Sequence, residues 1–212
     1  MSPIFEFLFG QYSGYATIDI VLELIGILFG LLSVWYAKKN TVWVYPTGMI
    51  STAIFVYLLL KWALLGDMII NAYYFVMSVY GWYYWSKKED EVIVHPITST
   101  SKKEVKTAVL LFVASIFFVF WVYQAFDKWR DWTAYVDTLT TAIFFVGMGL
   151  MARRKIEHWF FWIVGDIISI PLYFFKGFTL TSFQYIIFTL IAIYGYRSWK
   201  KILDKSSPLS LG

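Results

Sequence analysis

The sequence predicts an all-α integral membrane protein with seven transmembrane helices, arranged as two parallel three-helix repeats around one linking helix. Of its 212 residues, 59% are hydrophobic and only 15% are charged, whereas soluble domains are typically about 25% charged. The mean hydropathy is +0.62. Seven apolar segments approach the roughly 20 residues that a helix needs to cross the bilayer. The last three of these segments repeat features of the first three.

The first element expected is a short N-terminal segment, residues 1–17, that lies on the membrane surface. It has no basic residue before its apolar run, so it does not resemble a cleaved signal peptide. A long polar connection, Lys87–Lys103, contains the sequence KKEDEV and a Thr/Ser cluster and is predicted to be solvated. The seven spans are expected at Ile18–Ala37, Val42–Leu60, Met68–Trp85, Val105–Ala125, Ala134–Ala152, Trp159–Phe175 and Ser182–Trp199.

An internal repeat divides these spans into two groups. The first three end in YGWYYWSKK and the last three end in YGYRSWKK. Three spans plus one linking span return the chain to its starting side, so both groups point the same way, as in transporters of the SWEET type. Such a duplicated bundle could also serve a receptor or a scaffold. The expected units are 18–86 and 127–203 for the repeats, 87–126 for the loop and linking helix, and 204–212 for the tail. The matched positions are Ala37 and Ala152, Gly48 and Gly165, Gly66 and Gly177, and Tyr80-Gly81 and Tyr194-Gly195.

The distribution of basic residues predicts the orientation. Of the 18 Lys and Arg residues, 14 fall in the connections on one side and four fall on the other. The positive-inside rule therefore places the N-terminus outside and the C-terminus in the cytoplasm, next to anionic membrane lipids.

Two stripes of polar and aromatic residues are expected to line a substrate path between the repeats, although packing between helices would also explain them. In each stripe the spacing of three and four puts all members on one helical face. The counterparts of both stripes in the other repeat are less polar, and this divergence favours an asymmetric ligand. The first stripe is Asn71, Tyr74, Ser78, Trp82 and Trp85, with its counterpart at Tyr185, Phe188, Ala192, Tyr196 and Trp199. The second is Trp159, Trp162, Asp166, Ser169 and Tyr173, with its counterpart at Val42, Tyr45, Met49, Thr52 and Val56.

Asp166 is the ionisable residue expected near the middle of the bilayer, where a charge is costly and is usually functional. Three interpretations stay open: it binds a cationic or hydroxyl-bearing substrate, it carries a coupling proton, or it bonds to a neighbouring helix. Gln184 is expected at about the depth of Asn71, and both amides offer donors and acceptors to a substrate. Pro171 interrupts the sixth span and predicts a hinge just beyond Asp166.

The tryptophans allow two interpretations. Trp82, Trp159 and Trp162, together with Tyr74, could form a stacking box for an aromatic cation. An interfacial aromatic belt is the alternative, and it suits the tryptophans expected at span ends. Those are Trp43, Trp85, Trp129, Trp132 and Trp199, and Trp159 at the start of its span also fits it.

Several function classes lack their motifs. The chain has no cysteine and only two histidines, His95 and His158, so we expect no catalytic residue, no metal site and no cofactor. No phosphate-binding loop is present, which argues against ATP-driven pumping. The basic residues are scattered over loops, which argues against nucleic-acid binding.

The order Asn71-x-x-Tyr74, Tyr80-Gly81-Trp82-Tyr83-Tyr84-Trp85, Trp159-x-x-Trp162 and Asp166 resembles the PnuC family of vitamin transporters. The resemblance covers nearly the whole chain after about Ile18. It implies a SWEET-like homotrimer in the bacterial inner membrane. It also implies uptake of nicotinamide riboside by facilitated diffusion, with trapping of the nucleoside by a cytosolic kinase.

The predicted site residues suit this nucleoside-type vitamin. Its pyridinium cation suits the Trp and Tyr faces and Asp166, and its carboxamide and ribose suit Asn71, Gln184 and Ser78. Thiamine also carries a cationic aromatic ring, and the family includes thiamine and riboflavin transporters. Another vitamin therefore stays open as the substrate, as does a receptor or scaffold that moves no solute.

Overall fold

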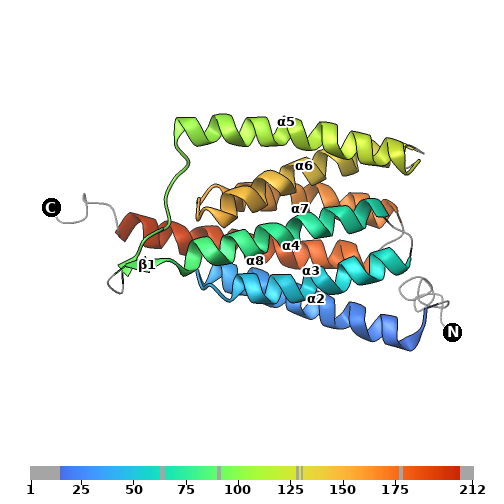
Figure 1. Cartoon of the computed structure of the whole chain (residues 1–212), viewed down its shortest axis with the longest axis horizontal. Helices are drawn as coiled ribbons and strands as arrows, with labels where there is room; N and C mark the ends of the chain where they lie inside the picture. The colour runs from blue at the N-terminus through green and yellow to red at the C-terminus, as the bar shows by residue number, and fades with distance from the viewer. Residues whose placement is uncertain are drawn as a thin grey trace.

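The computed structural model describes residues 15–62, 65–89, 92–127, 129, 131–176 and 179–205. These residues form seven helices and one antiparallel pair of two-residue strands (Figure 1). The helices are α2 (Thr17–Lys38), α3 (Val44–Lys61), α4 (Leu65–Ser86), α5 (Lys102–Ala125), α6 (Thr133–Ala152), α7 (His158–Phe175) and α8 (Thr179–Lys205), and the strands are β1 (Lys88–Glu89) and β2 (Val92–Ile93). The surface segment expected at residues 1–17 lies almost wholly outside the described residues, as does most of the tail after residue 204.

The seven-helix, all-α fold expected from the sequence is confirmed. Among the described residues, five helices are long and apolar enough to cross a membrane: α2, α3, α5, α6 and α7. α4 and α8 run beside them, since α4 packs on α3 and α6, and α8 packs on α7 and α2. The run of Trp and Tyr at the end of α4 lowers its hydropathy, and those rings face neighbouring helices in part.

The helices follow one another up and down the bundle, so α2 begins at one end of it and α8 finishes at the other (Figure 1). α2, α4, α6 and α8 run in one direction, and α3, α5 and α7 run in the other (Figure 1). Helices α2–α4 therefore have the same directions as α6–α8, with α5 between the two groups. We call the end that holds the α2–α3 and α6–α7 connections the basic end, because Lys38, Lys39 and Arg153–Lys155 lie there.

The α2–α3 and α6–α7 connections at the basic end have the same backbone. Asn40 and Arg154 adopt positive φ angles of 53° and 54°. An asparagine tolerates this left-handed conformation better than most residues, whereas an arginine there needs compensating contacts. The following amides bond back to the helix, Thr41 N to Tyr36 O at 3.1 Å and Lys155 N to Leu150 O at 3.0 Å.

These connections fix the register between the two repeats, because 154 − 40 gives an offset of 114 residues. The same offset relates the helix bounds Lys38 and Ala152, Val44 and His158, Lys61 and Phe175, and Leu65 and Thr179. It preserves the predicted match of Tyr80-Gly81 with Tyr194-Gly195. It corrects two other predicted matches, Ala37 with Ala152 and Gly48 with Gly165, which used offsets of 115 and 117, because identical small residues recur at several nearby positions in these helices. The fourth predicted match, of Gly66 with Gly177, used an offset of 111, and Gly177 lies outside the described residues.

The core between the repeats is aromatic. It includes Tyr45, Trp85, Trp159 and Trp199, all buried in the same cluster. Gly81 and Gly195 occupy equivalent positions in α4 and α8, and a Cβ there would overlap the ring of Tyr45 or Trp159. The two glycines therefore permit α4 to approach α3, and α8 to approach α7, in the same way in each repeat.

The connection between α4 and α5 is not the freely solvated loop that its polarity predicts. Thr98 forms a parallel bridge with Lys155, in which Thr98 N donates to Arg154 O and Ile156 N donates to Thr98 O. Ile97 is buried, and the ring of His95 stacks on Tyr84 at a centroid distance of 3.7 Å. The polar composition of the connection did not indicate that Ile97 and a set of backbone hydrogen bonds attach it to the second repeat.

Arg154 is the centre of this attachment. Its Nη1 donates to His95 O at 2.8 Å, and its guanidinium lies 4.2 Å from the centroid of the Trp85 ring. Burial lowers the pKa of the Arg154 guanidinium. The carbonyl and the indole face stabilise the buried cation and compensate for its left-handed backbone.

Candidate functional site

A cavity of about 240 Å³ lies between the two repeats. Its lining residues come from α2, α3 and α4 of the first repeat and from α6, α7 and α8 of the second. Five pairs related by the 114-residue offset face it from opposite sides: Val34 and Met148, Ala37 and Met151, Tyr45 and Trp159, Tyr74 and Phe188, and Ser78 and Ala192. The cavity therefore straddles the axis that relates the repeats, where transporters with parallel repeats bind their substrates.

Five of the eight predicted substrate residues line this cavity. They are Tyr74 and Ser78 on α4, and Trp159, Trp162 and Asp166 on α7. The spacing puts Tyr74 and Ser78 on one face of α4 and the other three on one face of α7, and the two faces meet the cavity from different repeats. Asp166 is 3% exposed. Among the described residues it takes part in no ion pair.

The other three predicted residues do not lie among the cavity-lining side chains. Trp82 is 43% exposed on the outside of the bundle. The Asn71 amide donates to Asp67 O of its own helix at 3.0 Å, and Gln184 is half-buried away from the cavity. A step of four residues turns the helix about 40° beyond a full turn, so the expected stripe drifts around α4. The inward face of α4 instead follows Tyr74, Ser78, Gly81 and Trp85.

Pro171 lies inside α7, which continues without a break from His158 to Phe175. The carbonyl of Ile170 just before it accepts a 2.8 Å hydrogen bond from the hydroxyl of Ser182 on α8. The expected hinge at Pro171 stays a prediction.

Four aromatic residues of the cavity wall were not among the predicted substrate residues. Tyr45, Phe144, Tyr185 and Phe188 line it together with Tyr74 and the two tryptophans. Phe144 stacks on Trp162 at 5.4 Å and lies parallel to Tyr185 at 6.2 Å, with 8° between the ring planes. The predicted counterparts of the two stripes already contained Tyr45, Tyr185 and Phe188, and the 114-residue register pairs Trp159 with Tyr45 instead of Val42.

The charge of the cavity is of one sign, and it lies in one repeat. Among its described lining residues, Asp166 is a carboxylate and none is a lysine, an arginine or a histidine. The counterpart of Asp166 in the first repeat is Thr52, whose hydroxyl bonds to Gly48 O of its own helix. A flat cation is the ligand that such a wall favours, since aromatic faces and one carboxylate both attract positive charge.

A layer of two tryptophans separates the cavity from the basic end. Trp85 Nε1 donates to Met151 O at 3.2 Å, and Trp199 Nε1 donates to Ala37 O at 2.9 Å. Each tryptophan thus bonds across to the other repeat, again at the 114-residue offset, and the two rings lie 5.7 Å apart. This overturns the aromatic-belt interpretation for Trp85 and Trp199, since a position at the end of a helix does not decide which way its side chain faces.

The described residues include no group of three or more His, Cys, Asp or Glu side chains that could hold a metal ion. His158, which begins α7, is fully buried beneath Trp199, and its Nδ1 lies 2.7 Å from Lys155 O. His158 therefore has a packing role at the basic end.

A sequence model of the family described as nicotinamide mononucleotide transporter matches residues 20–201. The chain belongs to this family. Members of the nicotinamide mononucleotide transporter family are membrane transporters and not enzymes, which fits the cavity between the repeats. The family match and the apolar helices together make the chain a multi-pass inner-membrane transporter of a small, vitamin-type substrate.

Characterised relatives span nearly the whole chain at low identity. A riboflavin/roseoflavin transporter, RibM, of Streptomyces davaonensis is 24% identical over 84% of this chain and 83% of its own length. The nicotinamide riboside transporter PnuC of Escherichia coli is 25% identical over 84% of each chain, and that of Haemophilus influenzae is 27% identical over 95% of this chain and 89% of its own. The resemblance to the PnuC family seen in the sequence is therefore confirmed.

A solved structure gives the same fold. The crystal structure of the vitamin B3 transporter PnuC superposes with a TM-score of 0.67, at 20% identity, over 93% of this chain and 96% of the other.

Proposed function

We propose that this chain carries nicotinamide riboside across the inner membrane by facilitated diffusion. The observation that carries the proposal is the carboxylate of Asp166, single among the described lining residues, in a mainly aromatic and apolar cavity between the repeats. Nicotinamide riboside joins one flat pyridinium cation to a ribose. The cation matches Asp166 and the Trp162 face, and the hydroxyl of Ser78 offers a partner to the ribose.

The proposed movement is alternating access around this cavity. The paired hydrogen bonds of Trp85 and Trp199 hold the basic end together. Their rupture would let the repeats separate at that end, with Pro171 as the proposed hinge. The basic end faces the cytoplasm in this proposal, and a separate cytosolic kinase traps the nucleoside as its phosphate. The transporter assembles as a homotrimer, which light scattering of the detergent-solubilised protein tests directly.

Riboflavin is the second candidate substrate, because a riboflavin/roseoflavin transporter is as similar to this chain as PnuC of Escherichia coli is. Its flat ring system could stack on the same aromatic wall. It carries no positive charge, however, so it leaves the buried Asp166 carboxylate without a cationic partner, which is costly. The charge of the substrate therefore separates the two candidates.

The test is a binding titration of the purified protein with nicotinamide riboside, thiamine and riboflavin side by side, followed by counterflow in proteoliposomes. We expect nicotinamide riboside to bind most tightly. Asp166→Asn should weaken it by about 10- to 100-fold, the range for a charged hydrogen bond. The matched control is Asp204→Asn, which removes an exposed carboxylate at the end of α8.

Preferred binding of riboflavin or thiamine would overturn the substrate assignment. Saturable binding without exchange of label across the bilayer would show a receptor rather than a transporter. Equal losses in the Asp166→Asn and Asp204→Asn proteins would show that the cavity carboxylate does not contact the substrate.

A further inference from the structure

A second cavity, of about 260 Å³, lies outside the substrate path, between α5 and the α6–α7 pair. We call it the α5 crevice. Val105, Val109 and Phe112 of α5 form one wall, and Val146 and Phe161 belong to the opposite side. Val105 and Val109 are about half exposed, so the crevice opens to the surface of the bundle. An apolar crevice that opens on the outside of a membrane-spanning bundle suits an acyl chain.

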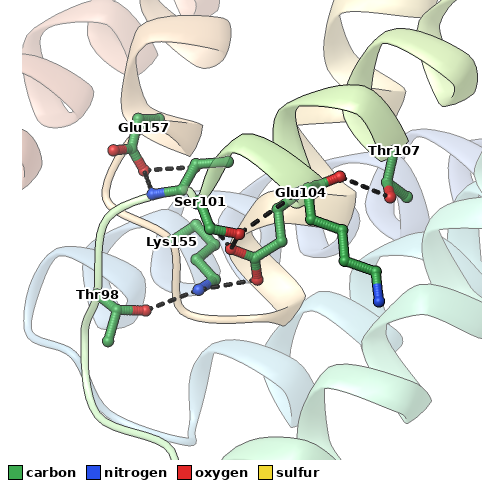
Figure 2. A network of polar contacts seen from close by, with 8 residues as sticks. Thr98, Ser101, Glu104, Thr107, Lys155 and Glu157 are labelled. Atoms are coloured by element: carbon green, nitrogen blue, oxygen red, sulfur yellow. Dashed lines mark hydrogen bonds and ion pairs between the residues drawn. The ribbon is translucent and has the colours of Figure 1, made fainter.

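The polar rim of the crevice lies at the basic end, where α5 begins (Figure 2). Thr100 donates to Glu157 from both its amide and its hydroxyl, at 2.9 and 2.6 Å. Glu104 accepts from Ser101 in a capping box and forms a 2.9 Å ion pair with Lys155. Glu104 is therefore balanced by the charge of Lys155, whereas Glu157 keeps one negative charge, because its partners at Thr100 are neutral donors.

Lysines without an ion pair stand above this rim. Lys102, Lys103 and Lys106, in the first two turns of α5, are exposed, and none takes part in an ion pair within the described part of the chain. Lys102 lies three residues before Val105 and seven before Val109, so it continues the stripe that lines the crevice. Lys106 lies one turn further along, at the edge of the same stripe. Lys102 and Lys106 thus put positive charge beside one end of the apolar crevice, at the level expected for lipid headgroups.

We propose that the α5 crevice binds one acyl chain of an anionic glycerophospholipid, with the phosphate against Lys102 and Lys106. The apolar wall accounts for the chain, and the surplus of lysine over unpaired carboxylate accounts for the headgroup charge. This site touches α5, which lies between the two repeats in the chain, and not the substrate cavity. It therefore stands whether or not nicotinamide riboside is the substrate.

Native mass spectrometry of the full chain in detergent tests the site, with dioleoyl phosphatidylglycerol and dioleoyl phosphatidylcholine as probes. We expect tighter binding of phosphatidylglycerol. Lys102→Gln/Lys106→Gln should weaken it by about fivefold for each lysine removed, and should leave phosphatidylcholine binding unchanged. Lys201→Gln/Lys205→Gln, which removes two exposed charges of α8 at the same end, is the matched control and should behave as wild type.

A crevice-filling variant tests the acyl chain. Ala108→Phe adds a ring to the α5 wall and should weaken the binding of both lipids, with the fold checked by circular dichroism. Glycerol 3-phosphate should not displace the lipid, because it has no acyl chain. Equal binding of the two lipids, wild-type affinity in the Lys102/Lys106 variant, or an equal loss in the control would each overturn the proposal. If Ala108→Phe does not fold, the two lysine variants decide it alone.

Discussion

Trp199 at the basic end of α8 donates its indole N–H to the carbonyl of Ala37 near the end of α2, over a distance of 2.9 Å. The two residues are 162 positions apart and belong to different repeats. Trp85 makes the equivalent bond to Met151 in the opposite direction. The repeats therefore hold each other through a reciprocal pair of hydrogen bonds on the path between the cavity and the basic end.

Trp199→Phe keeps an aromatic ring but removes the donor, leaving the Ala37 carbonyl without its indole partner. We expect a loss of about 1 kcal/mol, or a fall in Tm of about 2–4 °C for a chain of this size. Thermal unfolding in detergent measures it. The control is Trp82→Phe, since Trp82 is exposed, and its Tm should not change. Equal stability of both variants would contradict the role of this bond.

Gly195→Ala should destabilise the protein, because a Cβ at this position would overlap the buried ring of Trp159. Overpacking of this kind typically costs about 1–3 kcal/mol. Gly149→Ala is the control, since its nearest neighbour is the flexible end of Leu111 at 3.1 Å. Chemical denaturation of the two variants compares them. The double variant Gly195→Ala/Trp159→Leu should lose less than the sum of the single changes.

Trp162→Ala should weaken nicotinamide riboside binding by about tenfold, because it removes a stacking face from the cavity wall. Trp82→Ala should leave the affinity at the wild-type value, since Trp82 faces outward. Calorimetric titration of both proteins separates the two positions. A loss of affinity in the Trp82 variant alone would move the site to the other face of α4.

A proton gradient should not drive accumulation, because facilitated diffusion only equilibrates the substrate. In proteoliposomes we expect labelled nicotinamide riboside to reach the outside concentration and to stop there, with or without a pH difference. The Asp166→Asn protein should approach the same end point more slowly. Accumulation above equilibrium in wild type, abolished by Asp166→Asn, would instead establish proton coupling.

The orientation can be mapped because the chain has no cysteine of its own. Lys201→Cys at the basic end should react with a membrane-impermeant maleimide only after the cells are permeabilised. Trp132→Cys, an exposed position at the opposite end, should react in intact cells. The reverse pattern would place the basic end outside and contradict the positive-inside prediction.

Hydropathy predicted the helices within a few residues, because the bilayer requires long apolar segments whatever their packing. Hydropathy predicted how deep a residue lies in the membrane better than it predicted the direction of its side chain. Trp85 and Trp199 occupy the helix ends where interfacial tryptophans belong, yet they turn inward and bond to carbonyls of the other repeat. The direction of such a side chain depends on which helix packs against it, and the sequence alone does not give that packing.

The register between the repeats could likewise be predicted only in part from the sequence. The Tyr-Gly pair in α4 and α8 gave the correct offset. Each glycine packs against a large ring, and no other glycine lies near it in the same helix that could be matched instead. The matches of Gly48 with Gly165 and Ala37 with Ala152 failed, since small residues are common along packed membrane helices. Applied to the second stripe as well, the Tyr-Gly offset would have paired Trp159 with the cavity residue Tyr45 instead of Val42. The docking of Thr98 and Ile97 on the second repeat involves mainly backbone bonds and could not have been found in this way.

Asp166 and Thr52 occupy equivalent positions in the two repeats, and this difference explains why the repeats need to be joined in one chain. Two copies of a single repeat would present either two carboxylates or none to a cavity on their common axis. Joining the repeats in one polypeptide permits an odd number of carboxylates in the cavity. One carboxylate can then balance a ring that carries one positive charge, and it holds the ring in a single orientation. A symmetric dimer of half-length subunits could not offer a single carboxylate in this way.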